Sequence, residues 1–174
     1  KAEEEVQARL AESQQGAQTF YRKDKSGKIL ELEIVTVSSK ENTRAVEFIA
    51  GFWQGVGVKA NLKLVEPREI ARTVLKARKY DVLLYGEIIG ADPDPYPFWH
   101  SSQIDYPGLN LSRYVNRNAD ALIEKIRSAP SADDSVELYR KFQNMVLSDV
   151  PAIFLYMPTY TYATSVDLKG VDTS

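Results

Sequence analysis

The chain has 174 residues, of which 44% are hydrophobic and 26% charged, so it has the composition of a globular domain that can bury a core. Its net charge of -2 argues against the basic field of a nucleic-acid-binding protein, and no apolar run approaches the roughly 18 residues of a membrane span. The absence of cysteine excludes disulfides and thiolate chemistry.

The first third of the chain predicts a helix and then a hairpin. Residues 2–14 are typical of a weakly amphipathic helix. Residues 19–23 and 28–37 have the pattern of two strands, and the polar turn 24–27 that joins them contains a glycine.

The centre of the chain predicts strands that alternate with helices. Ser38-x-x-Glu41 matches a capping box and opens the first helix, whose expected inward residues are Ala45, Phe48, Ile49, Phe52 and Val56. A strand over 58–65 follows. Pro67 then suits the start of a second helix, which has Ile70, Val74 and Leu75 inward. The helix leads to a strand over 80–85. This β-α-β-α-β order implies an α/β fold with parallel central strands and right-handed crossovers.

The last third predicts two helices and a strand region. One helix spans 119–127, with Leu122, Ile123 and Ile126 inward. The other spans 132–147 and is opened by Ser131; its inward residues are Tyr139, Phe142 and Val146. Residues 152–163 are rich in β-branched and aromatic residues and predict a final strand.

The stretch from Tyr80 to Gln103 is the most informative part of the chain. There an apolar strand runs into a loop that gathers acids, prolines, aromatic rings and the only histidine. Open α/β sheets bind ligands at the carboxyl ends of their strands. We therefore expect the candidate site in this stretch. The rings of Tyr96, Phe98 and Trp99 either close the edge of the core or form a platform for a ligand.

The acids of this loop have more than one interpretation. Asp92 and Asp94 could act as general acid and base in a hydrolase. The sequence Asp-Pro-Asp-Pro is, however, also typical of a turn or loop. Together with Glu87 and His100 they could be pictured as a metal site. The spacing matches no helix-borne metal motif, however, so we expect no metal.

Other features argue against catalysis and cofactors. The chain has no Gly-x-Ser-x-Gly, no Walker loop and no Gly-x-Gly-x-x-Gly, so we expect neither an enzyme nor a cofactor.

Ser39 and Asn42, at the start of the first crossover helix, are expected to cap that helix, although a helix N-terminus also suits an anion. Besides a ligand-binding domain and a hydrolase, the sequence allows a third function, a protein-interaction module. Its contact surface would be formed by Tyr160, Tyr162 and the Trp99 loop.

The order of these segments resembles the C-terminal lobe of the extracellular solute-binding proteins of family 5, the oligopeptide-, dipeptide- and nickel-binding components of ABC importers. The resemblance covers nearly the whole chain. It is carried by Leu32-Glu33-Ile34-Val35 before a helix ending Gly55-Val56-Gly57-Val58, by Tyr80-Asp81-Val82, by Asp94-Pro95-x-x-Phe98-Trp99, by Asn110 to Tyr114 with Asn118 to Ile123, and by Val150 to Tyr156.

The resemblance implies a periplasmic-binding-protein-like lobe, residues 1–174, excised from a two-lobed protein. That protein would capture a small, peptide-like solute for a membrane permease, in the periplasm or anchored at the cell surface. In the peptide-binding members of the family, the strand that corresponds to residues 80–85 is followed by a Trp and, three residues on, by an Asp that pairs with the peptide amine. At the matching positions this chain has Glu87 and then Gly90 or Ala91. Four residues are expected to contact the ligand. Tyr85 would do so through the polar end of its side chain, Glu87 and Asp92 through their charge, and Trp99 by stacking of its ring. The expected partners are the solute, the N-terminal lobe and the permease, without nucleic acid.

Overall fold

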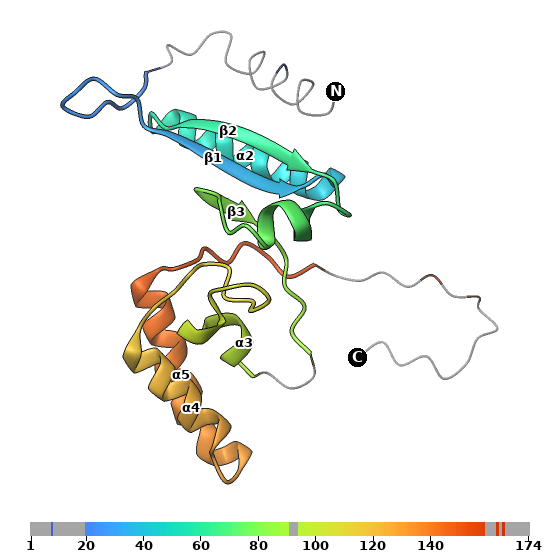
Figure 1. The fold of residues 1–174 in the computed structure, drawn as a ribbon, viewed down its shortest axis with the longest axis vertical. Helices are drawn as coiled ribbons and strands as arrows, with labels where there is room; N and C mark the ends of the chain where they lie inside the picture. Colours follow the sequence, from blue (N-terminus) through green and yellow to red (C-terminus); the bar gives the residue numbers. More distant parts are fainter. Residues whose placement is uncertain (1–7, 9–19, 91–93, 159–162, 164, 166–174) are drawn as a thin grey trace.

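The chain folds into two halves, a parallel sheet with helices on both faces and a helical half below it (Figure 1). The computed structural model describes residues 8, 20–90, 94–158, 163 and 165. The predicted helix over 2–14 lies outside the described residues, apart from residue 8. Within the described ranges, no helix is both long and apolar enough to cross a lipid bilayer.

The sheet half contains three strands in the order β2-β1-β3, all parallel. They are β1 (Glu31–Val37), β2 (Lys59–Val65) and β3 (Val82–Leu84). Ile34 at the centre of β1 pairs with Leu62 on one side and with Val82 on the other. The predicted β-α-β-α-β core with parallel strands is therefore confirmed.

Helix α2 (Lys40–Gly55) covers one face of the sheet, and of the inward residues that the sequence predicted Ile49 packs against the core there. Val46 and Ala50 are buried against the strands. Phe48 and Phe52, predicted to point inward, are 57% and 74% exposed, and Val56 is also exposed. Both sets of residues keep helical spacing, so periodicity alone did not select between them.

The start of α2 also differs by one residue from the predicted capping box. The N-cap is Ser39, whose hydroxyl oxygen accepts a hydrogen bond of 3.1 Å from the Asn42 backbone N–H. Ser38 instead belongs to the end of the sheet, where its N–H donates to the carbonyl of Val65. The predicted capping role of Ser39 is confirmed, and the assignment of Ser38 as the cap was wrong.

The second crossover covers the opposite face of the sheet. After a turn over 67–69 it forms a short π-helix, Ala71–Leu75, rather than the predicted regular helix to Arg78. Ile70 and Val74 are buried against Val35, as the sequence predicted. The sheet is therefore sandwiched between two layers, as an α/β fold requires.

The N-terminal hairpin is confirmed as a tight antiparallel turn that projects from the sheet (Figure 1). Lys23 and Ile29 form its bridge, and the Leu30 N–H donates to the Arg22 carbonyl at 2.8 Å. The second predicted strand leaves the hairpin and enters the sheet as β1.

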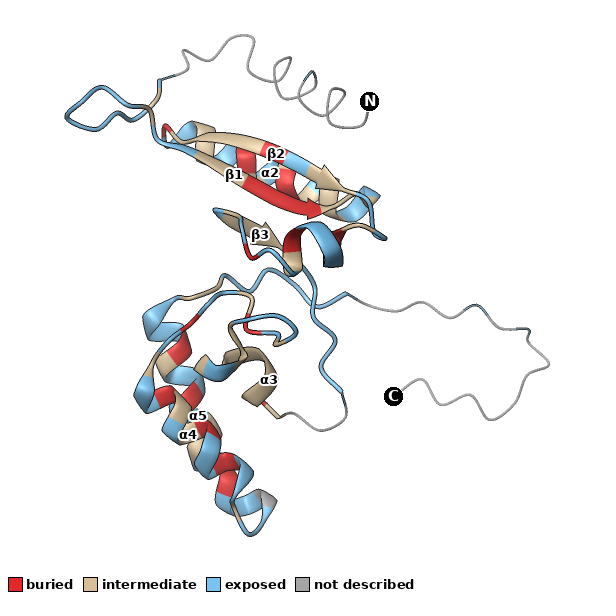
Figure 2. Ribbon diagram, viewed as in Figure 1, coloured by how far each residue is buried: buried red, intermediate tan, exposed pale blue. Residues whose placement is uncertain are grey.

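The helical half is built from α3 (Tyr96–Trp99), a 3₁₀ turn over Ser101–Gln103, α4 (Arg117–Arg127) and α5 (Ala132–Asp149). Helices α4 and α5 pack side by side, and their buried faces form a second core (Figure 2). That core contains the predicted inward residues Ile123, Ile126, Phe142 and Val146. Ser131 caps α5, as predicted.

The predicted final strand over 152–163 is not present in its described part, 152–158, which is irregular. A strand needs a neighbouring strand to satisfy its backbone groups. Side chains from Ile153 to Met157 are all exposed there, and Met157 is 91% exposed. High β-propensity alone therefore does not produce a strand in this segment.

Candidate functional site

The carboxyl edge of the sheet has the topology of a ligand-binding crevice. Strands β1 and β3 are neighbours, but the chain leaves β1 through α2 on one face and reaches β3 from the π-helix on the other. In open α/β sheets such a switch point leaves room for a ligand between the diverging connections. The Thr36 hydroxyl donates to the Leu84 carbonyl at 2.9 Å and fixes the two strand ends together.

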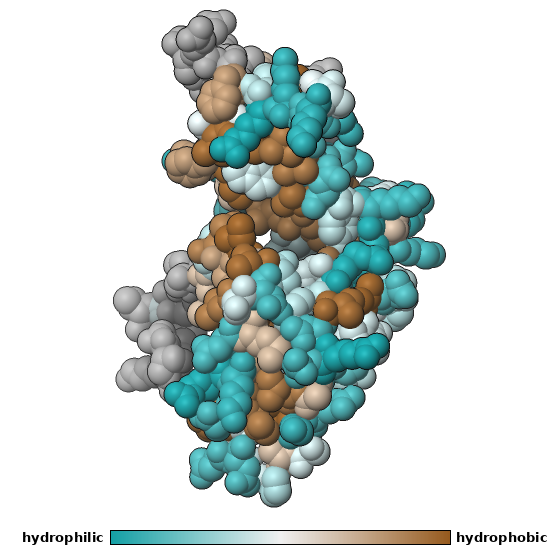
Figure 3. Space-filling view, turned by 90° about the vertical axis from the view of Figure 1, so that its left-hand side faces the viewer, coloured by the Kyte–Doolittle hydropathy of each residue, from teal (hydrophilic) through white to brown (hydrophobic). Residues whose placement is uncertain are grey.

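The segment Tyr85–Gly90 leaves β3 at this edge and is exposed throughout. Tyr85 is 38% exposed, and Ile88 and Ile89 are 86% and 64% exposed. Figure 3 shows apolar surface on both sides of the waist where the sheet half meets the helical half. Large apolar side chains that lie beside a carboxylate in water are typical of a contact surface. Sequence reasoning had singled out Tyr85 and Glu87 but not the two isoleucines.

Glu87 is the acid of this segment whose ionisation is perturbed. Partial burial of its carboxyl group raises the pKa of Glu87 to about 7, although the residue as a whole is exposed. The Arg78 guanidinium opposes this shift, which places a positive charge near the carboxyl group. Glu87 therefore changes charge near neutral pH.

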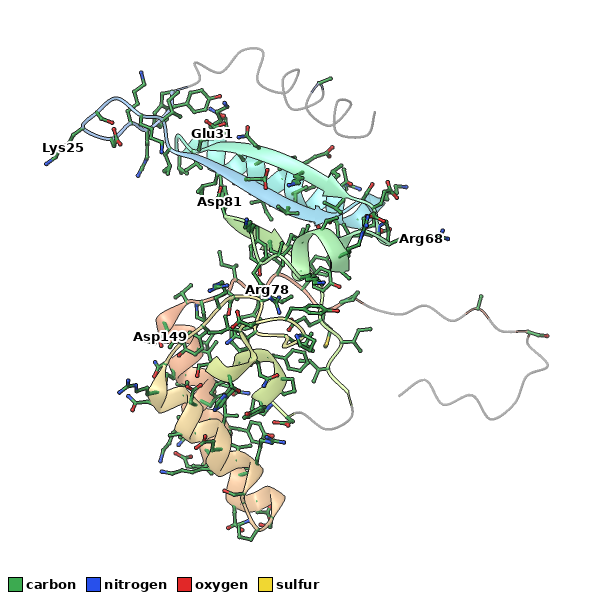
Figure 4. The ribbon with its side chains drawn as sticks, in the orientation of Figure 1. Lys25, Glu31, Arg68, Arg78, Asp81 and Asp149 are labelled. Carbon is green, nitrogen blue, oxygen red and sulfur yellow. The ribbon has the colours of Figure 1, made fainter. Side chains whose placement is uncertain are left out.

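Arg78 is a second charged residue near the site, and sequence reasoning missed it. It lies at the waist between the two halves (Figure 4). Its backbone adopts a left-handed conformation, with φ of 52°, and its side chain is buried. One guanidinium nitrogen, Nη2, donates to the Gly108 carbonyl, while Nε and Nη1 have no hydrogen-bond partner among the described residues. Nothing in the sequence around Ala77-Arg78-Lys79 indicated a buried arginine.

Trp99, the predicted stacking ring, is half-buried and packs in the helical half. Its ring meets Tyr114 edge-on at 6.2 Å, Phe142 at 6.5 Å and Phe154 at 5.9 Å between centroids. The structure thus brings Tyr85 and Glu87 together on one segment and places Trp99 among other aromatic rings. Its role as a ligand platform stays a prediction.

Of the two aspartates considered as a carboxylate pair, the structure describes only Asp94. Asp92 lies outside the described residues. Asp94 accepts a 3.0 Å hydrogen bond from the Tyr96 backbone N–H at the start of α3, and it lies 3.3 Å from Nε of Arg127. The Arg127 guanidinium in turn lies over the Tyr96 ring. Asp94 therefore joins α3 to α4, which is the turn-and-scaffold role considered from the sequence.

His100 was considered from the sequence as part of a metal site with Glu87, Asp92 and Asp94, and its ring faces α4. Its Nδ1 accepts a hydrogen bond of 3.1 Å from the Ser102 backbone N–H. Its Nε2 lies 3.6 Å from the Glu124 carboxylate and 4.0 Å from that of Asp120. Over the described part of the chain there is no group of three or more His, Cys, Asp and Glu side chains that could hold a metal ion.

Asn110 holds the loop below the site together, and its role was not predicted. It is completely buried. Its Nδ2 donates to the carbonyls of Trp99, His100 and Tyr114, and its Oδ1 accepts from the Tyr114 N–H at 3.0 Å. In the sequence it was visible only as the first residue of a family-like segment, with no signal that it would be buried.

Two curated relatives are similar to the chain in sequence. The oligopeptide-binding protein AppA of Bacillus subtilis is 27% identical over 152 residues, which are 84% of this chain and 27% of AppA. A probable di/tripeptide-binding protein 5 of Pseudomonas aeruginosa is 28% identical over 66% of this chain and 22% of its own length. The chain thus spans about a quarter of the length of these relatives. No protein-family model matches it.

Solved structures of such proteins share the fold. AppA of B. subtilis in complex with a nonapeptide has a TM-score of 0.65 at 24% identity, over 82% of this chain and 29% of AppA. A periplasmic oligopeptide-binding protein of Thermotoga maritima with bound mannohexaose also has a TM-score of 0.65, at 20% identity, over 78% of this chain and 26% of that protein.

The predicted resemblance is therefore confirmed: in sequence and in fold the chain is similar to the solute-binding proteins of family 5, the peptide- and nickel-binding components of ABC importers.

Proposed function

We propose that the chain is the C-terminal ligand-binding lobe of an ABC-importer solute-binding protein, and that it has no catalytic activity of its own. The observation that carries this proposal is the sequence similarity to an oligopeptide-binding protein over 84% of the chain, together with the shared fold. The whole protein would act in the periplasm or at the cell surface. There it would deliver its solute to a membrane permease.

The proposed solute is small and peptide-like, with a cationic amine. Glu87 is negatively charged above about pH 7 and lies on an exposed segment at the switch point of the sheet. An ammonium group would pair with this carboxylate, and Tyr85 would contribute its hydroxyl. The exposed Ile88 and Ile89 would contact apolar parts of the solute. Asp92 and Trp99 complete the proposed set as second charge partner and stacking ring.

A lone lobe has only part of a two-lobed site. The solute in such a protein is enclosed from both sides by hinge closure, so a single lobe offers roughly half of the contacts. We therefore expect the isolated chain to bind peptides more weakly than micromolar, and to bind them on one face only.

Peptide titration followed by NMR tests the proposal. Short peptides with a free amino terminus should shift the amide signals of residues 85–90, and blocking that amine by acetylation should reduce the shifts. Glu87→Gln should have the same effect as acetylation. Asp133→Asn, which removes one exposed carboxylate at the start of α5, should leave the shifts unchanged. Shifts that avoid residues 85–90, or that ignore the amine, would argue against the assigned site.

The rival function is hydrolysis by Asp92 and Asp94. The ion pair between Asp94 and Arg127 already gives Asp94 a scaffold role, so we favour binding. Turnover of glycosides or esters by the wild-type chain, abolished in Asp92→Asn, would reverse this preference. No turnover across such a panel is the expected result.

A further inference from the structure

The tip of the N-terminal hairpin concentrates positive charge that the proposed function does not use. Arg22, Lys23, Lys25 and Lys28 are all exposed. In the part of the chain that the structure describes, none of the four forms an ion pair. Figure 4 shows Lys25 at the far end of the hairpin, where it points away from the rest of the molecule.

The only acid of the hairpin is occupied by the turn itself. One carboxylate oxygen of Asp24 accepts from the Ser26 N–H at 2.8 Å, from the Ser26 hydroxyl at 2.6 Å and from the Lys28 N–H at 3.0 Å. Gly27 supplies the positive φ of 87° that closes the turn. The Asp24 carboxylate therefore shapes the loop and does not pair with the neighbouring cationic side chains.

The hairpin is also fixed to the sheet. The Arg22 N–H donates to the Gly57 carbonyl at 2.8 Å, and the Leu30 N–H donates to the Arg22 carbonyl. A frame held at both its tip and its base presents the four cations together, which reduces the entropy lost when they bind a partner.

The charge of the chain is strongly asymmetric. Residues 22–28 contain four basic residues and one acidic residue, a local charge of +3, while the whole chain carries -2. The remainder of the chain is thus at -5. A negatively charged surface would attract the hairpin and repel the rest, so the field selects one orientation.

We propose that this hairpin docks on an anionic lipid bilayer. Basic clusters next to a membrane bind acidic headgroups electrostatically. Arg22, Lys23, Lys28 and Leu30 border a hollow on the hairpin. Asp24 and Glu31 also line it, but the turn hydrogen bonds occupy Asp24 and the ion pair with Lys59 occupies Glu31, so the three cations remain for a phosphate. Phe20, which is 56% exposed, and Tyr21 directly precede this basic segment, so stacking of a nucleobase is tested separately below.

The docked orientation leaves the candidate site free. The hairpin leads directly into the amino-terminal end of β1, whereas Tyr85–Gly90 follows the carboxyl end of β3, which is parallel to β1 (Figure 1). The two features therefore lie at opposite edges of the same sheet. A chain held at a membrane by its hairpin would keep the carboxyl edge open to a solute.

Vesicle co-sedimentation tests the docking surface on the intact chain. Vesicles that contain phosphatidylglycerol should bind the wild type, and vesicles of phosphatidylcholine alone should not. The triple variant Lys23→Glu, Lys25→Glu and Lys28→Glu should bind roughly a hundredfold more weakly or worse. The matched control reverses three exposed lysines elsewhere, Lys40, Lys76 and Lys125, so the net charge is the same but the hairpin is intact. This control should lose much less binding than the hairpin variant.

Three results would overturn the proposal. They are no binding to anionic vesicles by the wild type, equal losses in the two triple variants, and tighter binding to nucleic acid than to vesicles. A second arm does not depend on how the variants fold: raising the salt concentration should release the wild type, because exposed charges are screened. Binding that resists salt would also contradict the proposal. None of these results bears on the NMR titration at residues 85–90, so the two proposals fail separately.

Discussion

The hydroxyl of Tyr80 donates a 2.6 Å hydrogen bond to the backbone carbonyl of Leu111 and so connects the two halves of the molecule. Tyr80 lies just before β3, and Leu111 belongs to the loop that leads to α4. The Arg78 guanidinium makes a second link, to the Gly108 carbonyl. These two bonds hold the segment that leads into β3 against the loop that leads to α4.

We expect Tyr80→Phe to loosen this connection. Removal of the hydroxyl leaves the Leu111 carbonyl without its partner, at a cost of about 1 kcal/mol in the free energy of unfolding. Urea denaturation measures that cost, and hydrogen exchange should become faster around Leu111. Tyr156→Phe, at an exposed tyrosine, should change neither quantity. Equal behaviour of the two variants would show that the hydrogen bond does not connect the halves.

Asn110→Ala should be among the most destabilising single substitutions in the loop. It leaves three backbone carbonyls and one N–H without the amide that serves them. The His100 carbonyl keeps the Gln103 N–H, so three groups lose their partner, and the expected loss is about 3 kcal/mol or more because each buried unpaired group costs about 1–3 kcal/mol. Asn144→Ala, on the exposed face of α5, should change the stability by less than about 0.5 kcal/mol. A similar small effect for both variants would contradict the assigned role of Asn110.

The position of the α2 cap can be tested by two neighbouring serines. Ser39→Ala removes the acceptor of the Asn42 N–H and should cost about 1 kcal/mol. Ser38→Ala keeps the backbone N–H that bonds to Val65 and should cost little. Thermal unfolding of the two variants decides the matter. A larger loss in Ser38→Ala would restore the capping box that the sequence predicted.

The raised pKa of Glu87 makes stability depend on pH with a defined sign. In the unfolded chain this carboxyl titrates near its ordinary value of 4.5, and in the folded chain near 7. The folded state therefore binds the proton more tightly, and the contribution of Glu87 to stability is lost as the pH rises between these values. Glu87→Gln should lack this loss. Urea unfolding at several pH values compares the two proteins, and parallel curves would refute the shifted pKa.

Arg78 should influence that titration from a distance. Its guanidinium lowers the pKa of Glu87 against the larger effect of burial. Arg78→Gln removes the charge, so the pKa of Glu87 should rise further above 7. NMR titration of the Glu87 carboxyl signal measures the change. A pKa that falls or stays constant would mean that the two groups do not interact.

The sequence predicted the parts of the fold that depend on local signals. Alternating helices and strands, the polar turn around Gly27 and the Ser131 cap were all recognised, because each follows from periodicity or from a single residue type. The side of α2 that faces the sheet was recognised only in part, since two sets of residues share the same period. Val46 and Ala50 are buried, whereas Phe48 and Phe52 are exposed.

The candidate site was predictable only where it follows a strand. Tyr85 and Glu87 were proposed from the sequence because they follow a predicted strand, and the structure places them directly after β3; their role as ligand contacts stays a prediction. Arg78 and Asn110 were missed because their burial arises from contacts with loops distant in sequence. No pattern within one segment records such a contact. Trp99 was recognised as notable, but its neighbours Phe142 and Phe154 come from other parts of the chain.

The central claim is that a solute is held at the carboxyl edge of this sheet. Native mass spectrometry of the protein as its host makes it, purified without refolding, tests that claim most directly. We expect the chain to occur within a longer polypeptide that carries a small amine-bearing molecule, and we expect Glu87→Gln to release it. A protein that carries no such molecule, or that retains it equally well in Glu87→Gln, would contradict the account.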